Sequence, residues 1–94
     1  MKIVMIGAGN VATNIAKTLA KIGETPAQIW SRTLASAEAL AETVDSCATS
    51  DWNSVMKDAD VYIVSVKDDA MLDVIEQLCS RCKHGVFIHT AGTM

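Results

Sequence analysis

Short apolar runs alternate with segments of helical periodicity along the whole chain. Residues 2–6 form a short, mainly apolar run that ends at Gly7, which is typical of a strand buried on both faces of a parallel sheet. The run at residues 47–49 is weak, so we expect that strand near an edge of the sheet. Similar apolar runs predict the remaining strands, at residues 27–31, 61–66 and 86–89.

The first two intervening segments predict amphipathic helices. A glycine, Gly23, is expected to stop the first helix, and Thr33 is expected to cap the second. The inner face of the first helix is predicted from apolar spacing to be Val11, Ile15, Leu19 and Ile22. The inner face of the second is predicted to be Ala37, Leu40, Ala41 and Val44.

The second half of the chain predicts two further helices. Asp51 can cap a short one, and Asp68 or Asp69 can cap a longer one that ends at His84 and Gly85. The short helix is expected to turn inward Trp52, Val55, Met56 and Ala59. The longer helix is expected to turn inward Leu72, Ile75, Leu78, Cys79 and Cys82.

Strands and helices therefore alternate five times, which predicts an α/β domain with a parallel sheet and right-handed crossovers. Helices should cover both faces of the sheet. The expected strand order is 3-2-1-4-5, the larger part of a doubly wound, dinucleotide-binding Rossmann fold. The whole chain, residues 1–94, is predicted to be one such domain.

Composition narrows the class of protein. The chain has 94 residues, of which 50% are hydrophobic and 20% are charged, and this balance excludes intrinsic disorder. The formal net charge is −3, with no basic cluster, so we expect no nucleic-acid partner. Apolar side chains are abundant for so small a body, and we expect some of them, near the fifth strand, to stay exposed.

Targeting signals and cysteine usage point to the cytoplasm. No segment is long enough to span a bilayer, and the longest uncharged run in the second half, residues 61–66, is about a third of the ~20 residues that a spanning helix needs. The apolar stretch at residues 3–6 is shorter than a signal-peptide core of roughly 7–15 residues. The chain has 3 cysteines, an odd number, which argues against a disulfide framework. We therefore expect a cytoplasmic protein without a membrane partner.

A glycine motif follows the first predicted strand. Residues 7–12, Gly-Ala-Gly-Asn-Val-Ala, fit the dinucleotide-binding pattern and open an amphipathic helix. Gly7 permits the tight turn, Gly9 lets the backbone approach a pyrophosphate, and Ala12 lets the helix pack closely on the strand. The amide groups of Asn10 and Val11 at the helix start would then face the phosphates. The alternative is a turn that is glycine-rich for structural reasons alone.

The end of the second predicted strand indicates which dinucleotide is bound. An NAD site places Asp or Glu about 20 residues after the glycines, where it binds the ribose 2′-hydroxyl. Here Ser31, Arg32 and Thr33 occupy that region, and no acid follows until Glu38 inside a helix. Arg32 can pair with a 2′-phosphate while the two hydroxyls donate to it, so we expect NADP (NADPH) as the cofactor. Alternatively, Arg32 is a solvated cation and Thr33 only a helix cap.

Several segments together resemble a known group of enzymes. Residues 7–12, 30–33, 59–61 and 66–67 look like the N-terminal domain of pyrroline-5-carboxylate reductases. Those enzymes belong with deazaflavin-dependent NADP reductases and 6-phosphogluconate and β-hydroxyacid dehydrogenases. Residues 89–92, His-Thr-Ala-Gly, look more like a sister family of Rossmann oxidoreductases with a helical C-terminal domain. The reductase pattern has proline after Lys67, whereas this sequence has Asp68. This departure argues against a role in proline biosynthesis.

This resemblance implies the rest of the site. The nicotinamide half would lie along Ser65, Val66, Lys67 and the segment from His89 through Thr90 to Gly92. His89 is the candidate proton donor or substrate-orienting group, and the alternative is a half-buried histidine bonded to backbone. A helical domain that carries the substrate pocket and a homodimer interface would follow. We therefore expect this chain to be an N-terminal fragment or an isolated domain.

No metal site is expected. Cys79 and Cys82 have the spacing of a CxxC motif, but a structural zinc site needs four ligands and only Cys47 and two histidines remain. A redox CxxC begins a helix, whereas this one is predicted to end a helix on its apolar face.

Trp30 can flank the adenine or simply pack on a helix.

Two function classes remain. The favoured one is the NADP-binding domain of an oxidoreductase that transfers hydride to or from a small carbonyl or imine substrate. Alone, such a domain would bind NADPH without turnover. The alternative is a non-catalytic nucleotide-sensing module, which would more often carry the absent ribose-binding acid. A methyltransferase domain, also built on a glycine-rich first turn, is a weaker third interpretation.

Overall fold

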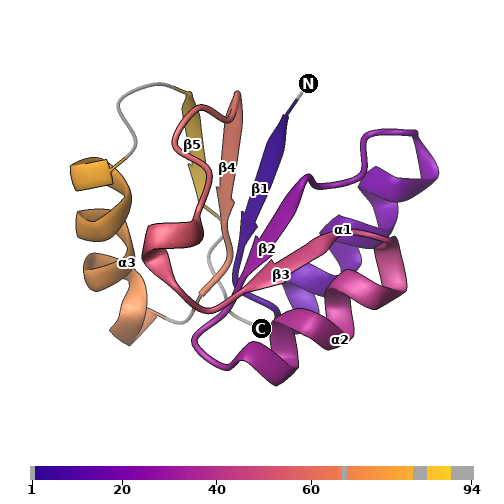
Figure 1. Ribbon diagram of the computed structural model, residues 1–94, viewed down its shortest axis with the longest axis horizontal. Helices are drawn as coiled ribbons and strands as arrows, with labels where there is room; N and C mark the ends of the chain where they lie inside the picture. Colours follow the sequence, from indigo (N-terminus) through magenta and orange to yellow (C-terminus); the bar gives the residue numbers. More distant parts are fainter. Residues whose placement is uncertain (1, 67, 82–84, 90–94) are drawn as a thin grey trace.

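The computed structural model describes residues 2–66, 68–81 and 85–89. A single parallel sheet runs through the domain in the order β3-β2-β1-β4-β5, as predicted (Figure 1). Its strands are β1 (Ile3–Ile6), β2 (Gln28–Trp30), β3 (Cys47–Thr49), β4 (Val61–Val64) and β5 (Val86–His89). The helical elements are α1 (Asn10–Lys21), α2 (Leu34–Val44), the 3-10 turn η1 (Trp52–Ser54) and α3 (Asp68–Arg81).

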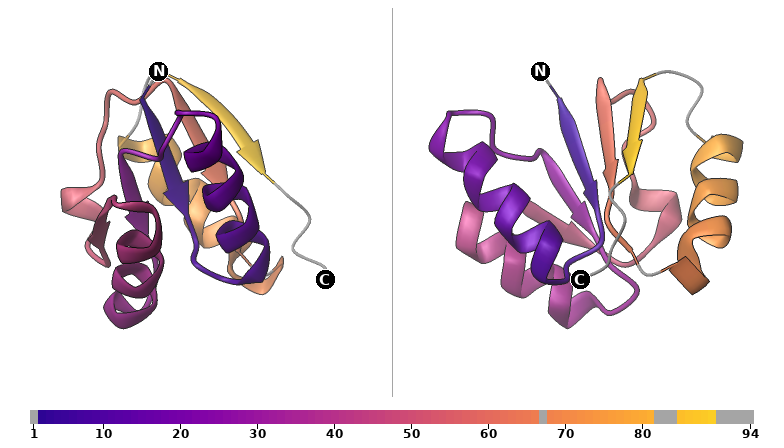
Figure 2. Two further views of the ribbon diagram at one scale, coloured as in Figure 1. Left: turned by 90° about the vertical axis from the view of Figure 1, so that its right-hand side faces the viewer. Right: turned by 180° about the vertical axis from the view of Figure 1, so that it is seen from behind.

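Helices cover both faces of the sheet. In Figures 1 and 2, α1 and α2 lie on one side of the strands, and η1 and α3 lie on the other. The central strand β1 is buried along its whole length, as a strand between two helical layers must be. Because all the strands are parallel, their carboxyl ends meet at one edge, the lower edge in Figure 1.

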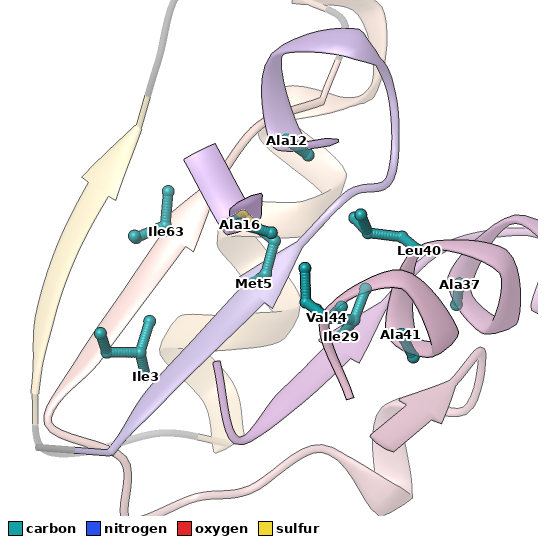
Figure 3. Close-up of a cluster of buried hydrophobic side chains, with 10 residues drawn as sticks. All are labelled: Ile3, Met5, Ala12, Ala16, Ile29, Ala37, Leu40, Ala41, Val44 and Ile63. Atoms are coloured by element: carbon teal, nitrogen blue, oxygen red, sulfur yellow. The ribbon is translucent and has the colours of Figure 1, made fainter. Parts of the chain in front are cut away.

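Two clusters of apolar side chains form the core. Figure 3 shows the cluster under α1 and α2, where Met5 and Ile29 of the sheet meet Ala12 and Ala16 of α1. The other cluster lies under η1 and α3 and joins Val4 and Ile6 to residues of β4 and α3. Alternate residues of β1 thus feed opposite layers of the domain.

The first helix packs through its smallest residues. Ala12 and Ala16 are fully buried, whereas the larger apolar residues predicted to face inward are only half-buried. The prediction for Ile22 is wrong, because Ile22 is the C-cap and is 66% exposed. Gly23, at φ +80°, ends the helix with its N–H on the carbonyl of Ala20, and the Glu24 N–H reaches that of Leu19. The helix stops before Ile22 can turn inward.

The second helix confirms its predicted inner face: Ala37, Leu40, Ala41 and Val44 are all buried. Thr33 occupies the N-cap position, but its side chain makes no capping hydrogen bond. Its backbone carbonyl instead accepts from the N–H groups of Ser36 and Ala37.

The connection from β3 to β4 is not the short helix that was predicted. Only η1 is helical, and Val55 is already extended. Asp51 does cap this turn, because its carboxylate accepts from the Asn53 N–H at 2.9 Å. Long-range bonds hold the segment after η1, since the Gln28 side chain of β2 bonds the backbone of Ser54 and Met56. These contacts replace the hydrogen bonds that a helix would supply.

A different face of α3 packs on the sheet from the one predicted. Leu78, as predicted, is completely buried, together with Val74 one turn earlier. Leu72 is 78% exposed and Cys79 is also exposed, so both predictions are wrong. Val74 and Leu78, spaced by four, form the inner stripe, which turns Leu72 away from the sheet. Cys82 and His84 lie outside the described residues.

The strands differ from prediction mainly in length. β2 and β4 are shorter than expected, and residues 65 and 66, which follow the end of β4, border a pocket at the carboxyl edge of the sheet. Val86 and Ile88 of β5 remain largely exposed on the side of α1, as expected for the apolar surface near this strand. None of the described helices is long and apolar enough to cross a membrane.

Candidate dinucleotide site

A pocket of about 280 Å³ opens at the carboxyl ends of β1, β2 and β4. This is where open α/β sheets bind their ligands. It is lined by Gly7, Ala8, Gly9, Trp30, Ser31, Arg32, Ser65 and Val66. The structure therefore brings the glycine turn, the end of β2 and the end of β4 together, as the sequence predicted.

Gly7 lies where three strands approach one another. Its φ is +116°, and a β-carbon built on it would lie 2.1 Å from the carbonyl oxygen of Ser65. Its N–H donates to the carbonyl of Trp30 at 2.6 Å. Only glycine fits this position, for reasons of both conformation and space.

Gly9 is an open position at the start of α1. It is the N-cap of the helix, is exposed, and a β-carbon built on it would meet no described atom within 4 Å. The first turn of α1 carries no acidic side chain, so the positive end of the helix dipole is not neutralised there. Glycine has no side chain, so the space in front of the helix start stays open. An anionic group such as a pyrophosphate fits there, whereas a side chain on residue 9 would occupy that space.

Ala12, the last position of the glycine motif, has no exposed surface and packs in the core beneath α1. Val11 beside it is half-buried. α1 begins at Asn10. The small residue at position 12 thus keeps the helix start close to β1, the role that the motif predicted for it.

The β2–α2 connection borders the pocket with polar groups. Ser31 is buried; its N–H donates to the Thr49 carbonyl at 3.1 Å, and its Oγ accepts from the Thr33 N–H at 3.4 Å. Arg32 and Thr33 are exposed, and within the described ranges no carboxylate pairs with Arg32. Glu38 lies on the exposed side of α2, so the loop offers a cation and hydroxyls but no acid.

Comparison with protein families identifies the family to which the chain belongs. Residues 2–91 match the model of the family described as coenzyme F420-dependent NADP oxidoreductases. The chain belongs to this NADP oxidoreductase family.

Two solved structures similar to this chain are consistent with the family assignment. A Bacteroides fragilis protein assigned as an NADP oxidoreductase is 40% identical, with a TM-score of 0.90 over 99% of this chain and 37% of its own. Pyrroline-5-carboxylate reductase of Coxiella burnetii is 28% identical, with a TM-score of 0.83 over 96% of this chain and 35% of its own. The chain thus spans little more than a third of either relative.

A more distant structure extends the likeness in fold. The imine reductase of Myxococcus stipitatus, solved in complex with NADP+, is 21% identical, with a TM-score of 0.79 over 99% of this chain and 32% of its own. At this identity the likeness concerns the fold alone. The search of curated proteins found no match.

In this NADP oxidoreductase domain, the predicted nicotinamide side is partly described. Ser65 is buried and its N–H donates to the Ile6 carbonyl at 2.8 Å, and Val66 lines the pocket. His89 ends β5 in register with Val64, one residue before Ser65, so its backbone lies at the same edge of the sheet. The side chains of Asn10 and His89, and the whole of Lys67 and Thr90, lie outside the described residues.

From the sequence alone, Ala8 was assigned no ligand contact and Trp30 no single role. Ala8 lines the pocket simply because it sits between the two glycines. Trp30, for which the sequence left two roles open, lines the pocket and also packs in the core. Its position as the last residue of β2 was the available signal.

The ionisable side chains that the structure describes form no second site outside the pocket. Among the described residues, no three metal-binding side chains cluster. The Lys2 ammonium, 3.1 Å from Asp58, lowers the pKa of that exposed carboxyl by hydrogen bonding and by charge attraction. Lys2 precedes β1, so this pair lies at the opposite end of the strand from the glycine turn and takes no part in the pocket.

Proposed function

We propose that this chain is the NADP(H)-binding domain of an oxidoreductase that transfers hydride between the nicotinamide and a small carbonyl or imine substrate. The observation that carries the proposal is one pocket that contains both an open glycine cradle at Gly9 and a cation, Arg32, that pairs with no carboxylate of the described residues. A pyrophosphate requires the first and a ribose 2′-phosphate favours the second.

Each part of the cofactor would have its own protein groups. The amides at the start of α1 would hold the pyrophosphate, beginning with those of Asn10 and Val11. Arg32 would pair with the 2′-phosphate and Thr33 would donate its hydroxyl, while Ser31 shapes their turn through its bond to the Thr33 N–H. The cofactor itself supplies the hydride chemistry.

The remaining predicted contacts concern the nicotinamide half. Ser65 and Val66 border the pocket at the end of β4, where this half would lie, and Lys67, His89 and Thr90 come at the ends of β4 and β5 in sequence. His89 is proposed as the group that donates a proton or orients the substrate. Placing these groups beside the nicotinamide would align the substrate and limit water at the reacting atoms.

The substrate class is proposed from the relatives. Pyrroline-5-carboxylate reductase and imine reductase are named for compounds with a carbon–nitrogen double bond. This chain spans only about a third of each relative. We therefore propose that a further helical domain completes the substrate pocket and forms a homodimer. As a separate proposal, we place the protein in the cytoplasm. The 94 residues alone should then bind NADPH without turning over a panel of cyclic imines, ketones and aldehydes.

Calorimetric titration with NADPH and NADH tests the cofactor assignment. Wild-type chain should bind NADPH more tightly. Arg32→Ala should weaken NADPH binding by roughly 10- to 100-fold, the loss of a charged phosphate contact, and leave NADH binding unchanged. Lys57→Ala, which removes an exposed cation that does not line the pocket, is the matched control and should change neither. Equal weakening of both cofactors by Arg32→Ala would refute the 2′-phosphate contact.

A further inference from the structure

The outer strand β5 leaves one side of the sheet open. β5 pairs with β4 in unbroken register, and none of the described strands pairs with its other side. Val86, Phe87 and Ile88 of this strand are between 38% and 59% exposed. Natural edge strands are commonly protected by charged residues, by proline or by a bulge. This stretch has neither a charge nor a proline, so its open side is suited to pair with another strand.

Both faces of β5 expose apolar side chains. Ile88 is in register with Ile63, which packs under α1, so Val86 and Ile88 point to that side of the sheet. None of the described helices covers β5 on that side (Figure 2). Phe87 points to the side of α3, where its ring meets Tyr62 edge-on with the ring centroids 5.4 Å apart.

The helix α3 adds an exposed stripe beside this strand. On one flank of α3, Arg81 donates to the Asn53 side chain of η1 at 2.8 Å. Leu72, Ile75 and Cys79 lie on the opposite flank, which faces away from η1. Leu72 is 78% exposed, and α3 lies at the outer edge of the domain next to β5 (Figure 1).

Four residues at this edge, Leu72, Val86, Phe87 and Ile88, are named the β5 surface here. Their exposed fractions leave on the order of 400 Å² of apolar area. A stable interface of standard size buries about 800 Å² on each partner, of which roughly three-fifths is apolar. The β5 surface therefore supplies most of the apolar area that one side of a stable dimer needs.

We propose that two copies of this chain associate through the β5 surface, with their β5 strands paired antiparallel about a two-fold axis. The Val86 N–H donates to the Asp60 carbonyl on the β4 side, so the N–H and the carbonyl of Phe87 point outward. With the axis at Phe87, the two Phe87 residues exchange both of these hydrogen bonds. Val86 then lies opposite the partner's Ile88, so every facing pair is apolar.

A second copy covers this surface more completely than an isolated strand. A peptide would pair with β5 but leave Leu72 exposed, whereas a copy of this chain brings both a strand and a helix. The axis places the two α3 helices antiparallel on one face of the joined sheet. The acidic start of each helix, Asp68 and Asp69, then lies beside the end of the other, which carries Arg81. Opposite charges and opposed helix dipoles favour this arrangement.

This inference goes beyond the proposed function and does not depend on the cofactor. The contact needs only the 94 residues of the chain. It is separate from any homodimer contact that a further domain would make.

Sedimentation equilibrium of the 94-residue chain across the micromolar range tests the proposal. We expect a reversible dimer. Ile88→Lys places a charge inside the interface and should raise the dissociation constant of the dimer roughly 100-fold. Leu72→Lys, at the margin of the interface, should raise it roughly 10-fold. Circular dichroism checks the folding of each variant, and Leu72→Lys decides the question where Ile88→Lys loses its native spectrum.

Leu34→Lys is the matched control. Leu34 is 45% exposed, close to the 47% of Ile88, but it begins α2, which packs on β2 and β3 at the other end of the sheet. The same chemical change there should leave the dissociation constant unchanged. An equal loss of dimer in Leu34→Lys would overturn the proposal, because the effect would then not depend on the β5 surface.

Hydrogen exchange at the Phe87 amide shows which face is used. In a dimer paired through β5, this amide should exchange roughly 10-fold or more slowly in concentrated than in dilute protein. The inference is overturned by a dimer in which the Phe87 amide exchanges as fast as in the monomer, or by lysine variants that dimerise like the wild type. A chain that stays monomeric over the whole range also overturns it and leaves the β5 surface to a further segment of a longer protein.

Discussion

The β-carbon that alanine would place at position 7 lies 2.1 Å from the carbonyl oxygen of Ser65. This approach closes the gap between the end of β1 and the end of β4. The same backbone segment has a positive φ, which glycine adopts without strain. Gly7 is therefore required by the fold, independently of any ligand, whereas no described neighbour requires glycine at position 9.

Gly7→Ala should destabilise the domain. The new methyl group must push Ser65 aside, and alanine is strained at φ +116°. Together we expect the free energy of unfolding to fall by about 2 kcal/mol or more. Urea denaturation followed by circular dichroism measures this loss. A variant with wild-type stability would mean that β1 and β4 do not approach as described.

Gly9→Val should leave folding intact and abolish dinucleotide binding. No described atom lies within 4 Å of the added β-carbon, and the φ of −80° suits any residue. The side chain would instead fill the space proposed for the pyrophosphate. Calorimetry with NADPH should detect no binding by a protein with a native unfolding transition. Unchanged NADPH affinity would remove the glycine turn from the site.

Gly23→Ala is the matched control for both glycine variants. Gly23 has a φ of +80° at the end of α1 but no described neighbour within 4 Å of a β-carbon. The substitution should cost about 1 kcal/mol through backbone strain alone. NADPH affinity should stay at the wild-type value, which shows that modest destabilisation by itself does not empty the pocket.

The glycine turn illustrates how much local sequence can predict. Gly7, Gly9 and Ala12 have separate local reasons for their small size, and each reason can be read from the order of strand, turn and helix. The alternation of elements predicted the parallel sheet, and the strand order was that of the dinucleotide-binding fold. The inner face of α2 was also predictable, because its buried residues all follow one helical stripe.

Other features depend on contacts that local sequence does not encode. For α3, two overlapping apolar stripes compete, and the stripe of Val74 and Leu78 packs while Leu72 does not. In the β3–β4 connection, the partner of Ser54 and Met56 is Gln28, 26 and 28 residues away. No helical periodicity can reveal a side chain on another strand. The two roles considered for Trp30 stayed undecided for the same reason.

Gln28→Leu should loosen the connection that carries Trp52. Leucine fits the buried position but removes the hydrogen bonds of Gln28 to the Ser54 carbonyl and the Met56 N–H. Each of these partly buried hydrogen bonds contributes about 0.5–1.5 kcal/mol. We expect a clear loss in the free energy of unfolding, measured in urea, and a red-shifted tryptophan emission as Trp52 becomes more exposed.

Gln77→Leu provides the comparison for that variant. Gln77 on α3 accepts one hydrogen bond, from Arg81 at 3.2 Å, and anchors no other described element. Its replacement should change stability by no more than about 0.5 kcal/mol. Equal effects of the two glutamine variants would show that the Gln28 amide is not a special anchor.

Leu78→Ala and Leu72→Ala together test which face of α3 packs on the sheet. Leu78 has 0% exposed surface and lies in the cluster with Val74, so its truncation should leave a cavity and cost about 2–5 kcal/mol. Leu72 is 78% exposed, and alanine there has a slightly higher helix propensity, so stability should change by no more than about 0.5 kcal/mol. Both residues are leucines on one helix, so the chemical change and the helical propensity are matched between the variants. Urea unfolding of the two proteins measures the difference. A Leu72→Ala variant that loses as much as Leu78→Ala would mean that α3 is rotated toward the stripe of Leu72, Ile75 and Cys79, the face that apolar spacing alone predicts.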